Sequence, residues 1–177
     1  MTEPITWGFD LHESYVLNAN KAAGHWAKNS DGKEVVRKLG HTHQRTHRLP
    51  RLERARIDVK VSYPTRRLQD VMNLYPTMKA YVDGLVNGLP QYEIVAAKGG
   101  IPKKKRLAPD VAFGILPDDN DIFLSGPHME WSGRVSDRKA HFQFEVTLTE
   151  LPRLVLPRDV IPPSILQRHP ELAGSAD

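Results

Sequence analysis

Four ionisable residues between positions 70 and 119 are of the types that cleave phosphodiester bonds. Asp70 and the neighbours Asp118 and Asp119 supply carboxylates, and Lys79 supplies a cation. Carboxylate oxygens are ligands that Mg²⁺ prefers, and the bound ion activates water and neutralises charge on the phosphate. A nearby lysine stabilises the same developing charge. Together, these residue types could perform metal-assisted hydrolysis of a nucleic-acid backbone.

The spacing of these residues also fits a purely structural role. Acids that precede a helix often serve only as caps. A run such as Asp-Asp-Asn-Asp at 118–121 often forms only a turn. Which of the two roles applies depends on the helices and strands that position the four residues.

A clear strand precedes Asp70. Apolar and polar residues alternate from Ile57 to Tyr63, which predicts a half-buried strand with one wet face. Pro64 stops this strand. The residues from 66 to 73 therefore fall in the loop at its carboxyl end.

A helix is predicted to carry Lys79. Asn73 is a good N-cap, Pro76 fits the first turn, and the helix should run to about Gly88. Lys79 and Asp83 are four residues apart, so they share a face and could pair. The apolar face of the helix consists of Leu74, Met78, Val82 and Leu85.

Periodicity and helix breakers predict three further strands and one further helix. The strands span 5–11, 121–131 and 139–151, and the helix runs from Asp31-Gly32 to about Arg48. A short loop at 132–137 joins the last two strands, which predicts an antiparallel hairpin. The order strand, helix, strand, helix, strand, strand predicts an α+β fold: a small mixed sheet of about four strands with two helices packed on one face.

Length and composition indicate one domain with two additions. The chain has 177 residues, which suits a single domain, so residues 1–151 are assigned to it. Residues 88–112 form a basic insertion that we predict to be a long loop. Residues 152–177 are rich in proline and predict an arm lying on the body or on a partner subunit, followed by a disordered tail.

The charge is clustered. The net charge is +4, yet seven cationic residues and one acid lie between Arg37 and Arg56, and a second basic run spans Lys103 to Arg106. Such clusters are typical of surfaces that bind polyanions. The alternative is that both runs are only solvated surfaces.

Other features of the sequence predict a cytoplasmic protein. There is no cysteine, so a disulfide framework is excluded and a reducing compartment is suitable. No apolar run has the length of about 20 residues that a membrane span needs. The first residues lack the layout of a signal peptide.

The residues of the central stretch form an ordered series of short motifs. They read Arg66-Arg67-x-x-Asp70-x-x-Asn73-Leu74, then Lys79, then Asp83-Gly84-Leu85, and then Gly114-Ile115-Leu116-Pro117-Asp118-Asp119. This series resembles the RusA-type Holliday junction resolvases of phages and prophages. The resemblance is firm from about 63 to 121 and softer outside this stretch. It covers neither the insertion at 88–112 nor the residues after 151.

The resemblance assigns roles residue by residue. Asp70 matches the first catalytic aspartate of the family, and Asn73 matches the asparagine of the same motif. Lys79 matches the essential helix lysine. Asp119 matches the third catalytic aspartate, preceded by Asp118 as in the family. The implied metal ligands are thus Asp70, Asp118 and Asp119, and the implied ion is Mg²⁺ or Mn²⁺.

The second catalytic aspartate of the family falls on Met72, which does not bind Mg²⁺. The resemblance implies a homodimeric endonuclease that binds four-way DNA junctions and nicks two opposed strands during recombination and repair. Met72 adds the alternative of a catalytically degenerate relative that binds branched DNA without cutting. A third alternative is a small interaction protein with no nucleic-acid role. The DNA contacts that we predict are Arg66, Arg67 and Asn73 from the matched motif, and Arg45, Arg48, Lys103, Lys104, Lys105 and Arg106 from the two basic clusters.

Three histidines at 41, 43 and 47 allow a zinc site, because positions 43 and 47 could share a helix face. The chain has no cysteine and no obvious fourth ligand. A polar or DNA-facing helix is therefore the preferred interpretation of the three histidines.

Overall fold

The computed structural model describes most of the chain. Its described residues are 3–21, 26–66, 70–87, 92–95, 103–106, 114–154 and 160–172. The main elements are β1 (Ile5–His12), α1 (Trp26–Thr46), β2 (Ala55–Tyr63), α2 (Tyr75–Asn87), β5 (Leu124–Val135) and β6 (His141–Glu150). This order confirms the predicted α+β fold.

The four main strands form one mixed sheet in the order β1-β6-β2-β5. β6 pairs antiparallel with β1 and β2, and β2 pairs in parallel with β5. The prediction that β5 and β6 form an antiparallel hairpin is therefore wrong. The two strands run in opposite directions, but β2 lies between them.

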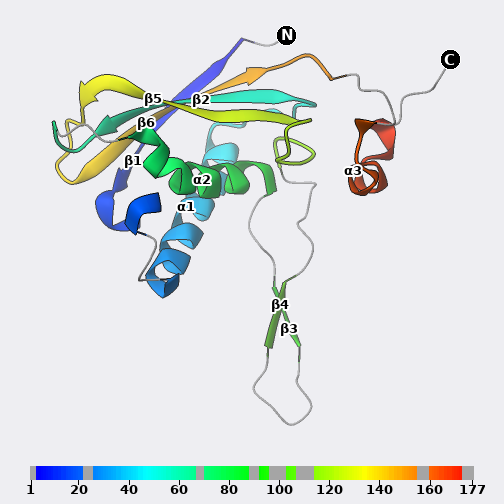
Figure 1. Ribbon diagram of the computed structural model, residues 1–177, viewed down its shortest axis with the longest axis horizontal. Helices are drawn as coiled ribbons and strands as arrows, with labels where there is room; N and C mark the ends of the chain where they lie inside the picture. The colour runs from blue at the N-terminus through cyan, green and yellow to red at the C-terminus, as the bar shows by residue number, and fades with distance from the viewer. Residues whose placement is uncertain are drawn as a thin grey trace.

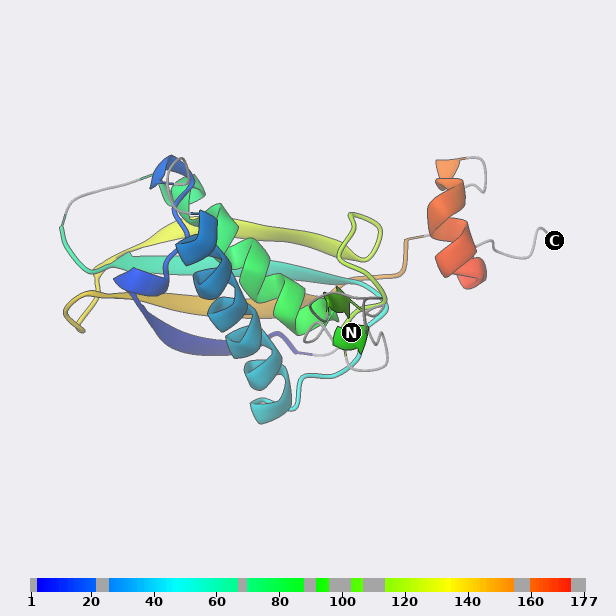
Figure 2. The same ribbon diagram turned by 90° about the horizontal axis from the view of Figure 1, so that it is seen from below.

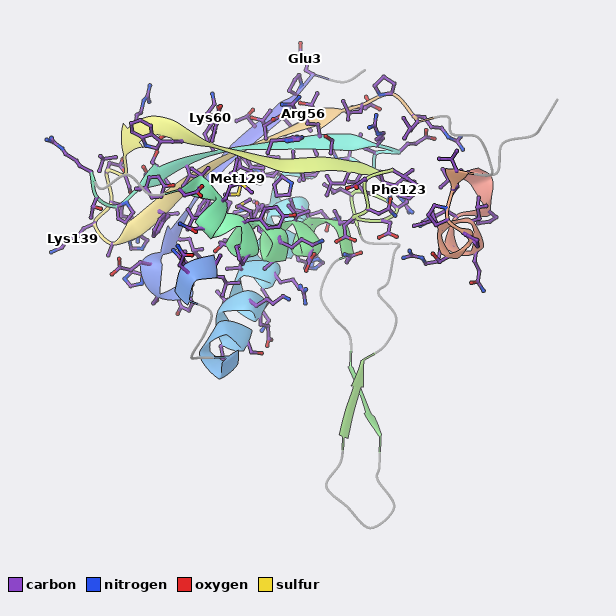
Figure 3. The ribbon with its side chains drawn as sticks, in the orientation of Figure 1. Glu3, Arg56, Lys60, Phe123, Met129 and Lys139 are labelled. Carbon is purple, nitrogen blue, oxygen red and sulfur yellow. The ribbon has the colours of Figure 1, made fainter. Side chains whose placement is uncertain are left out.

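Both long helices cover the same face of the sheet, as predicted, and α1 crosses α2 (Figures 1 and 2). The opposite face carries polar side chains, among them Arg56 and Lys60 of β2 (Figure 3). Alternate residues of β2 are buried from Ala55 to Tyr63, and they face the helices. The predicted period of two is thus realised in the strand at the centre of the molecule.

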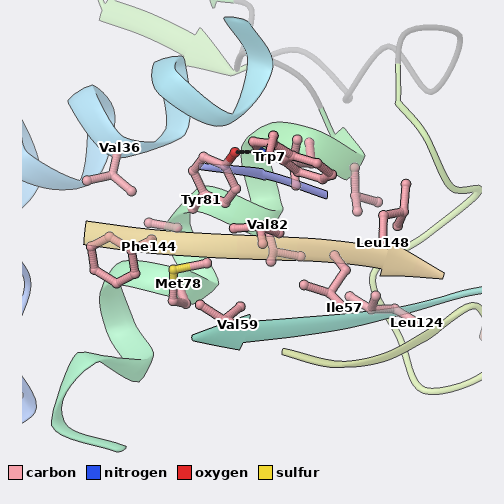
Figure 4. Close-up of a cluster of buried hydrophobic side chains, with 14 of the residues drawn as sticks. Trp7, Val36, Ile57, Val59, Met78, Tyr81, Val82, Leu124, Phe144 and Leu148 are labelled. Carbon is pink, nitrogen blue, oxygen red and sulfur yellow. Dashed lines mark hydrogen bonds between the residues drawn. The ribbon is translucent and has the colours of Figure 1, made fainter. Parts of the chain in front are cut away.

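The core lies between α2 and the sheet. Val36 of α1 and Met78, Tyr81 and Val82 of α2 pack against side chains of β2 and β6 (Figure 4). The indole nitrogen of Trp7 donates a hydrogen bond of 2.7 Å to the buried hydroxyl of Tyr81. Burial raises the pKa of Tyr81 far above its usual range, so this hydroxyl stays neutral.

Two glycines let α1 and α2 approach closely. A Cβ atom on Gly84 would lie 2.0 Å from the carbonyl oxygen of Arg37, and one on Gly40 would lie 2.2 Å from that of Tyr81. Real side chains do not tolerate such distances to backbone atoms. The two helix backbones therefore touch at these glycines, and this contact sets Arg37 beside α2.

Substitution of Gly84 by Ala is expected to destabilise the fold by about 3 kcal/mol and to lower Tm by roughly 6–12 °C, because the helices must separate. Thermal and urea unfolding measure the change. Gly8→Ala is the control, since its Cβ would meet only Phe144 O at 3.5 Å. If Gly84→Ala instead stabilised the protein, as alanine does in an uncrowded helix, the close contact would be refuted.

Several elements differ from the sequence predictions. α1 begins at Trp26, before the predicted start after Asp31-Gly32. A 3₁₀ turn, η3 (Val71–Leu74), precedes α2; Asp70 caps this turn, and Asn73, the predicted helix cap, lies within it. The insertion predicted as a loop contains an antiparallel pair, β3 (Tyr92–Val95) and β4 (Lys103–Arg106), which extends away from the sheet in Figure 1.

The C-terminal segment from 160 to 172 contains a short helix α3 (Pro163–Arg168) and a 3₁₀ turn η6 (Pro170–Leu172). It packs on the chain just before β5, where Phe123 joins a small apolar cluster with Ile161, Ile165 and Leu172. Figure 3 shows Phe123 at the end of the sheet nearest α3. Among the described residues, no helix is long and apolar enough to cross a membrane.

Candidate functional site

Lys79 is the centre of the candidate site. Its Nζ lies 3.0 Å from Oδ1 of Asp83, one turn further along α2, which confirms the predicted pairing of these residues. The same Nζ forms an ion pair and hydrogen bond with Oδ2 of Asp119, which is 40 residues away in the chain. The structure thus brings together two residues that the sequence assigned to one site.

The segment from 114 to 119 carries Asp119 to α2. Ile115 donates a hydrogen bond of 3.2 Å to the carbonyl of Leu85, near the end of α2, and accepts one of 2.8 Å from the amide of Leu52. Ile115 and Leu116 are fully buried. The chain is therefore anchored at the end of α2, and the next residues reach Lys79.

Lys79 is held as an ammonium ion. Burial lowers the pKa of Lys79, but hydrogen bonds to Asp119 and Asp83 and their negative charges raise it further, so the net pKa is raised. A raised pKa in the folded state means that the pairing stabilises the fold below the unfolded pKa of about 10.4. That contribution is lost only as the pH rises through the raised value. Lys79 is therefore fully charged at neutral pH.

Asp83 connects the site to α1. Its Oδ2 accepts a hydrogen bond from the guanidinium of Arg37, and both side chains are largely buried, with exposed fractions of 13% for Asp83 and 17% for Arg37. Arg37, Asp83, Lys79 and Asp119 thus form a continuous chain of alternating charge. Such a chain fixes the position of the Lys79 ammonium from one side.

Asp70 lies apart from this chain of charges. Its Oδ1 accepts a hydrogen bond of 2.9 Å from the amide of Met72, which makes it the cap of η3. Asp70 forms no ion pair with any described residue, although its charge adds to the effect of burial in raising the pKa of Tyr63. Met72 is 53% exposed, so it packs little against the core.

Topology explains why Asp70 is separate. Asp70 follows the last residue of β2, whereas Asp118 and Asp119 precede the first residue of β5. The first residues of the two strands, Ala55 and Leu124, are paired, because β2 and β5 are parallel. The loop after β2 and the loop before β5 therefore start from opposite ends of this strand pair.

The predicted metal ligands do not gather in the described part of the chain. No group of three or more histidine, aspartate or glutamate side chains there is placed to hold a metal ion. The Asp119 carboxylate is paired with Lys79, and the Asp118 carboxylate faces Arg168. The donor set as it stands does not fit a Mg²⁺ ion shared by Asp70, Asp118 and Asp119.

The predicted DNA contacts are distributed over several elements. Arg45 and Arg48 are exposed at and after the end of α1, before β2, and Arg66 is exposed after β2. Asn73 is half-buried within η3, where its amide donates to the carbonyl of Asp70. Lys103, Lys104, Lys105 and Arg106 form β4, and only their backbone is described; Arg67 lies outside the described residues.

The histidines of α1 are not gathered around a metal in the described structure. Nδ1 of His43 lies 2.7 Å from the Tyr81 hydroxyl, and its ring packs against Phe9 and His47. Burial, with the nearby His47 charge, lowers the pKa of His43. His43 therefore belongs to the helix–sheet packing.

Sequence reasoning missed Arg37 and Arg168 as partners of the site. A signal for Arg37 was present, because a glycine inside each helix, Gly40 and Gly84, is typical of close helix approach. Arg168 lies in a segment that carries no periodic pattern. Its contact could be found only from the structure.

Comparison with known proteins assigns no family to the chain. No family model matches the sequence. No curated protein matches it either. Function must therefore be argued from the residues and their geometry.

Proposed function

We propose that this protein is a RusA-type endonuclease that acts on four-way DNA junctions in recombination and repair. It would work in the cytoplasm as a homodimer, with Mg²⁺ or Mn²⁺ supplied from solution. The observation that supports this proposal is the contact between Lys79 and Asp119. The resemblance selected these two residues from motifs 40 positions apart, and they meet in the fold.

Each charged residue of the chain has a separate proposed role. The Lys79 ammonium, with 41% of its side chain exposed, is accessible to a phosphate and stabilises charge that develops on it. Asp83 and Arg37 hold the ammonium in place from the protein side. Asp119, whose side chain is 24% exposed, would orient an attacking water or accept its proton.

The cationic residues Arg45, Arg48 and Arg66, together with those of β4, would contact DNA phosphates without reading sequence. Phosphate contacts position a protein on nucleic acid, and they make affinity depend steeply on salt. A substrate recognised by its branched shape needs contacts that are spread over a wide surface. The position of these cations before and after β2 suits such a surface.

One observation favours a second candidate function, a branched-DNA-binding protein that does not cut. The carboxylates Asp70, Asp118 and Asp119 do not gather in the described structure, and the exposed Met72 occupies the position of a further acid. Phosphate binding by the cationic residues does not require an acid at position 72. Binding without cleavage would be the result in this case.

A labelled four-way junction in the presence of Mg²⁺ distinguishes the two functions. We expect paired nicks in opposed strands, and we expect Asp119→Asn to slow cleavage by at least about 100-fold, with junction affinity changed by less than about threefold. Asp121→Asn is the control, since Asp121 is an exposed acid of the same turn. Salt-sensitive binding without nicks would support the second function, and the absence of binding at low salt would exclude both.

A further inference from the structure

The C-terminal segment contacts the turn before β5 that carries Asp118 and Asp119. Nη1 of Arg168 lies 2.7 Å from Oδ2 of Asp118, and Nε2 of His169 lies 3.9 Å from the same oxygen. Asp118 is 9% exposed. Its Oδ2 is buried without an aligned hydrogen-bond donor, so the Arg168 contact is an ion pair and not a hydrogen bond.

The other oxygen of Asp118 contacts the backbone of the next residue. Its Oδ1 accepts a hydrogen bond of 2.8 Å from the amide of Asp119. The side chain of Asp119 is in turn paired with Lys79. One carboxylate therefore joins Arg168 to the backbone of the residue that meets the candidate catalytic lysine.

Apolar packing fixes α3 beside this turn. Ile161, Ile165 and Leu172 form a cluster with Phe123, and the ring of His169 meets the ring of Phe123 edge-on at 4.8 Å between centroids. The packing of this segment on Phe123 thus holds Arg168 beside Asp118. The N–H groups of Phe123 and Leu124 both donate to the carbonyl of Asn120, which closes the turn.

We propose that Arg168 is a positioning residue for Asp119, and that residues 160–172 complete the candidate site. Arg168 neutralises the buried Asp118 carboxylate, which then holds the Asp119 amide and sets the direction of its side chain toward Lys79. This inference rests on the proposed function for its effect on catalysis. Its structural part, the link from Arg168 to the Asp119 amide, does not depend on that function.

The first measurement is hydrogen exchange of the Asp119 amide by NMR on the full chain. Arg168→Gln is expected to speed this exchange by at least about fivefold, because Asp118 loses its counter-ion and the turn loosens. Arg168→Lys keeps the charge and should remain within about twofold of wild type. Arg138→Gln is the matched control, since Arg138 is 60% exposed and pairs with Asp10 at 3.3 Å away from the turn.

The second measurement is junction cleavage. Arg168→Gln is expected to lower kcat about tenfold with KM within about twofold, and Arg168→Lys should restore most of the loss. Unchanged Asp119 exchange in Arg168→Gln overturns the inference, as does a loss confined to KM, which would make Arg168 a direct DNA contact. If exchange changes as expected but the wild type cuts no junction, the positioning link stands and the proposed function fails.

Discussion

Replacement of Met72 by Asp is expected to raise Mg²⁺-dependent junction cleavage by at least about 100-fold over wild type. Oδ1 of Asp70 already lies 2.9 Å from the backbone amide of residue 72. A carboxylate at 72 would therefore stand next to the Asp70 carboxylate. Two adjacent acids give the hard oxygen donors that the described structure does not gather.

The fold should tolerate this substitution. Met72 is 53% exposed, and η3 continues directly into α2, so position 72 is at the start of a helical stretch. An acid there interacts favourably with the helix dipole. We expect the free energy of unfolding to change by less than about 0.5 kcal/mol. A gain in cleavage would then come from chemistry and not from stability.

Position 72 lies seven residues before Lys79, and η3 leads directly into α2. Seven residues rise about 10 Å along an α-helix axis, so the added acid would not contact Lys79. The new carboxylate would instead stand beside Asp70 at the start of η3.

Met72→Asn is the matched control, because it introduces a polar side chain of similar size to Asp without a charge. Initial rates of junction nicking, with binding measured in the absence of Mg²⁺, give the comparison. Equal rates for wild type and Met72→Asp would show that residue 72 does not limit cleavage. Tight binding with no cleavage in Met72→Asp would show that the site lacks more than this acid.

The sequence predicted elements better than it predicted their pairing. Alternation from 57 to 63 specifies a half-buried strand wherever it sits in a sheet, so β2 could be predicted while its neighbours could not. The short loop after β5 suggested a hairpin, yet β2 lies between β5 and β6. One signal was available: Pro127 within β5 is typical of an edge strand. β5 is indeed at the edge of the sheet.

In the candidate site, too, only the contact that is local in the sequence could be predicted. Lys79 and Asp83 are neighbours on one helix, and spacing alone predicts that pair. The contact of Lys79 with Asp119 depends on how residues 114–119 pass along α2, which no local pattern encodes. The convergence of Asp70 with Asp119 required the loops after β2 and before β5 to meet. Parallel pairing of these strands starts the two loops at opposite ends.

Lys79 and Asp119 are expected to behave as one functional unit. Lys79→Met and Asp119→Asn should each slow cleavage by at least about 100-fold, and the double variant should be no slower than the slower single variant by more than about threefold. The reason is that each side chain is held by the other. Once the ammonium is lost, the Asp119 carboxylate loses its ion-pair partner, so its removal costs little more.

The same pair can be tested without any substrate. Lys79 is 41% exposed, so solvent screens its charge, and a double-mutant cycle on unfolding free energy should give a coupling of about 0.5–1 kcal/mol. Lys60 and Glu130 provide the control pair, at 3.9 Å and with 54% and 65% exposed, and their coupling should be close to zero. Additive rates together with zero coupling would mean that the Lys79–Asp119 contact does not persist in solution. Coupling without cleavage would leave the contact intact and point to the DNA-binding alternative.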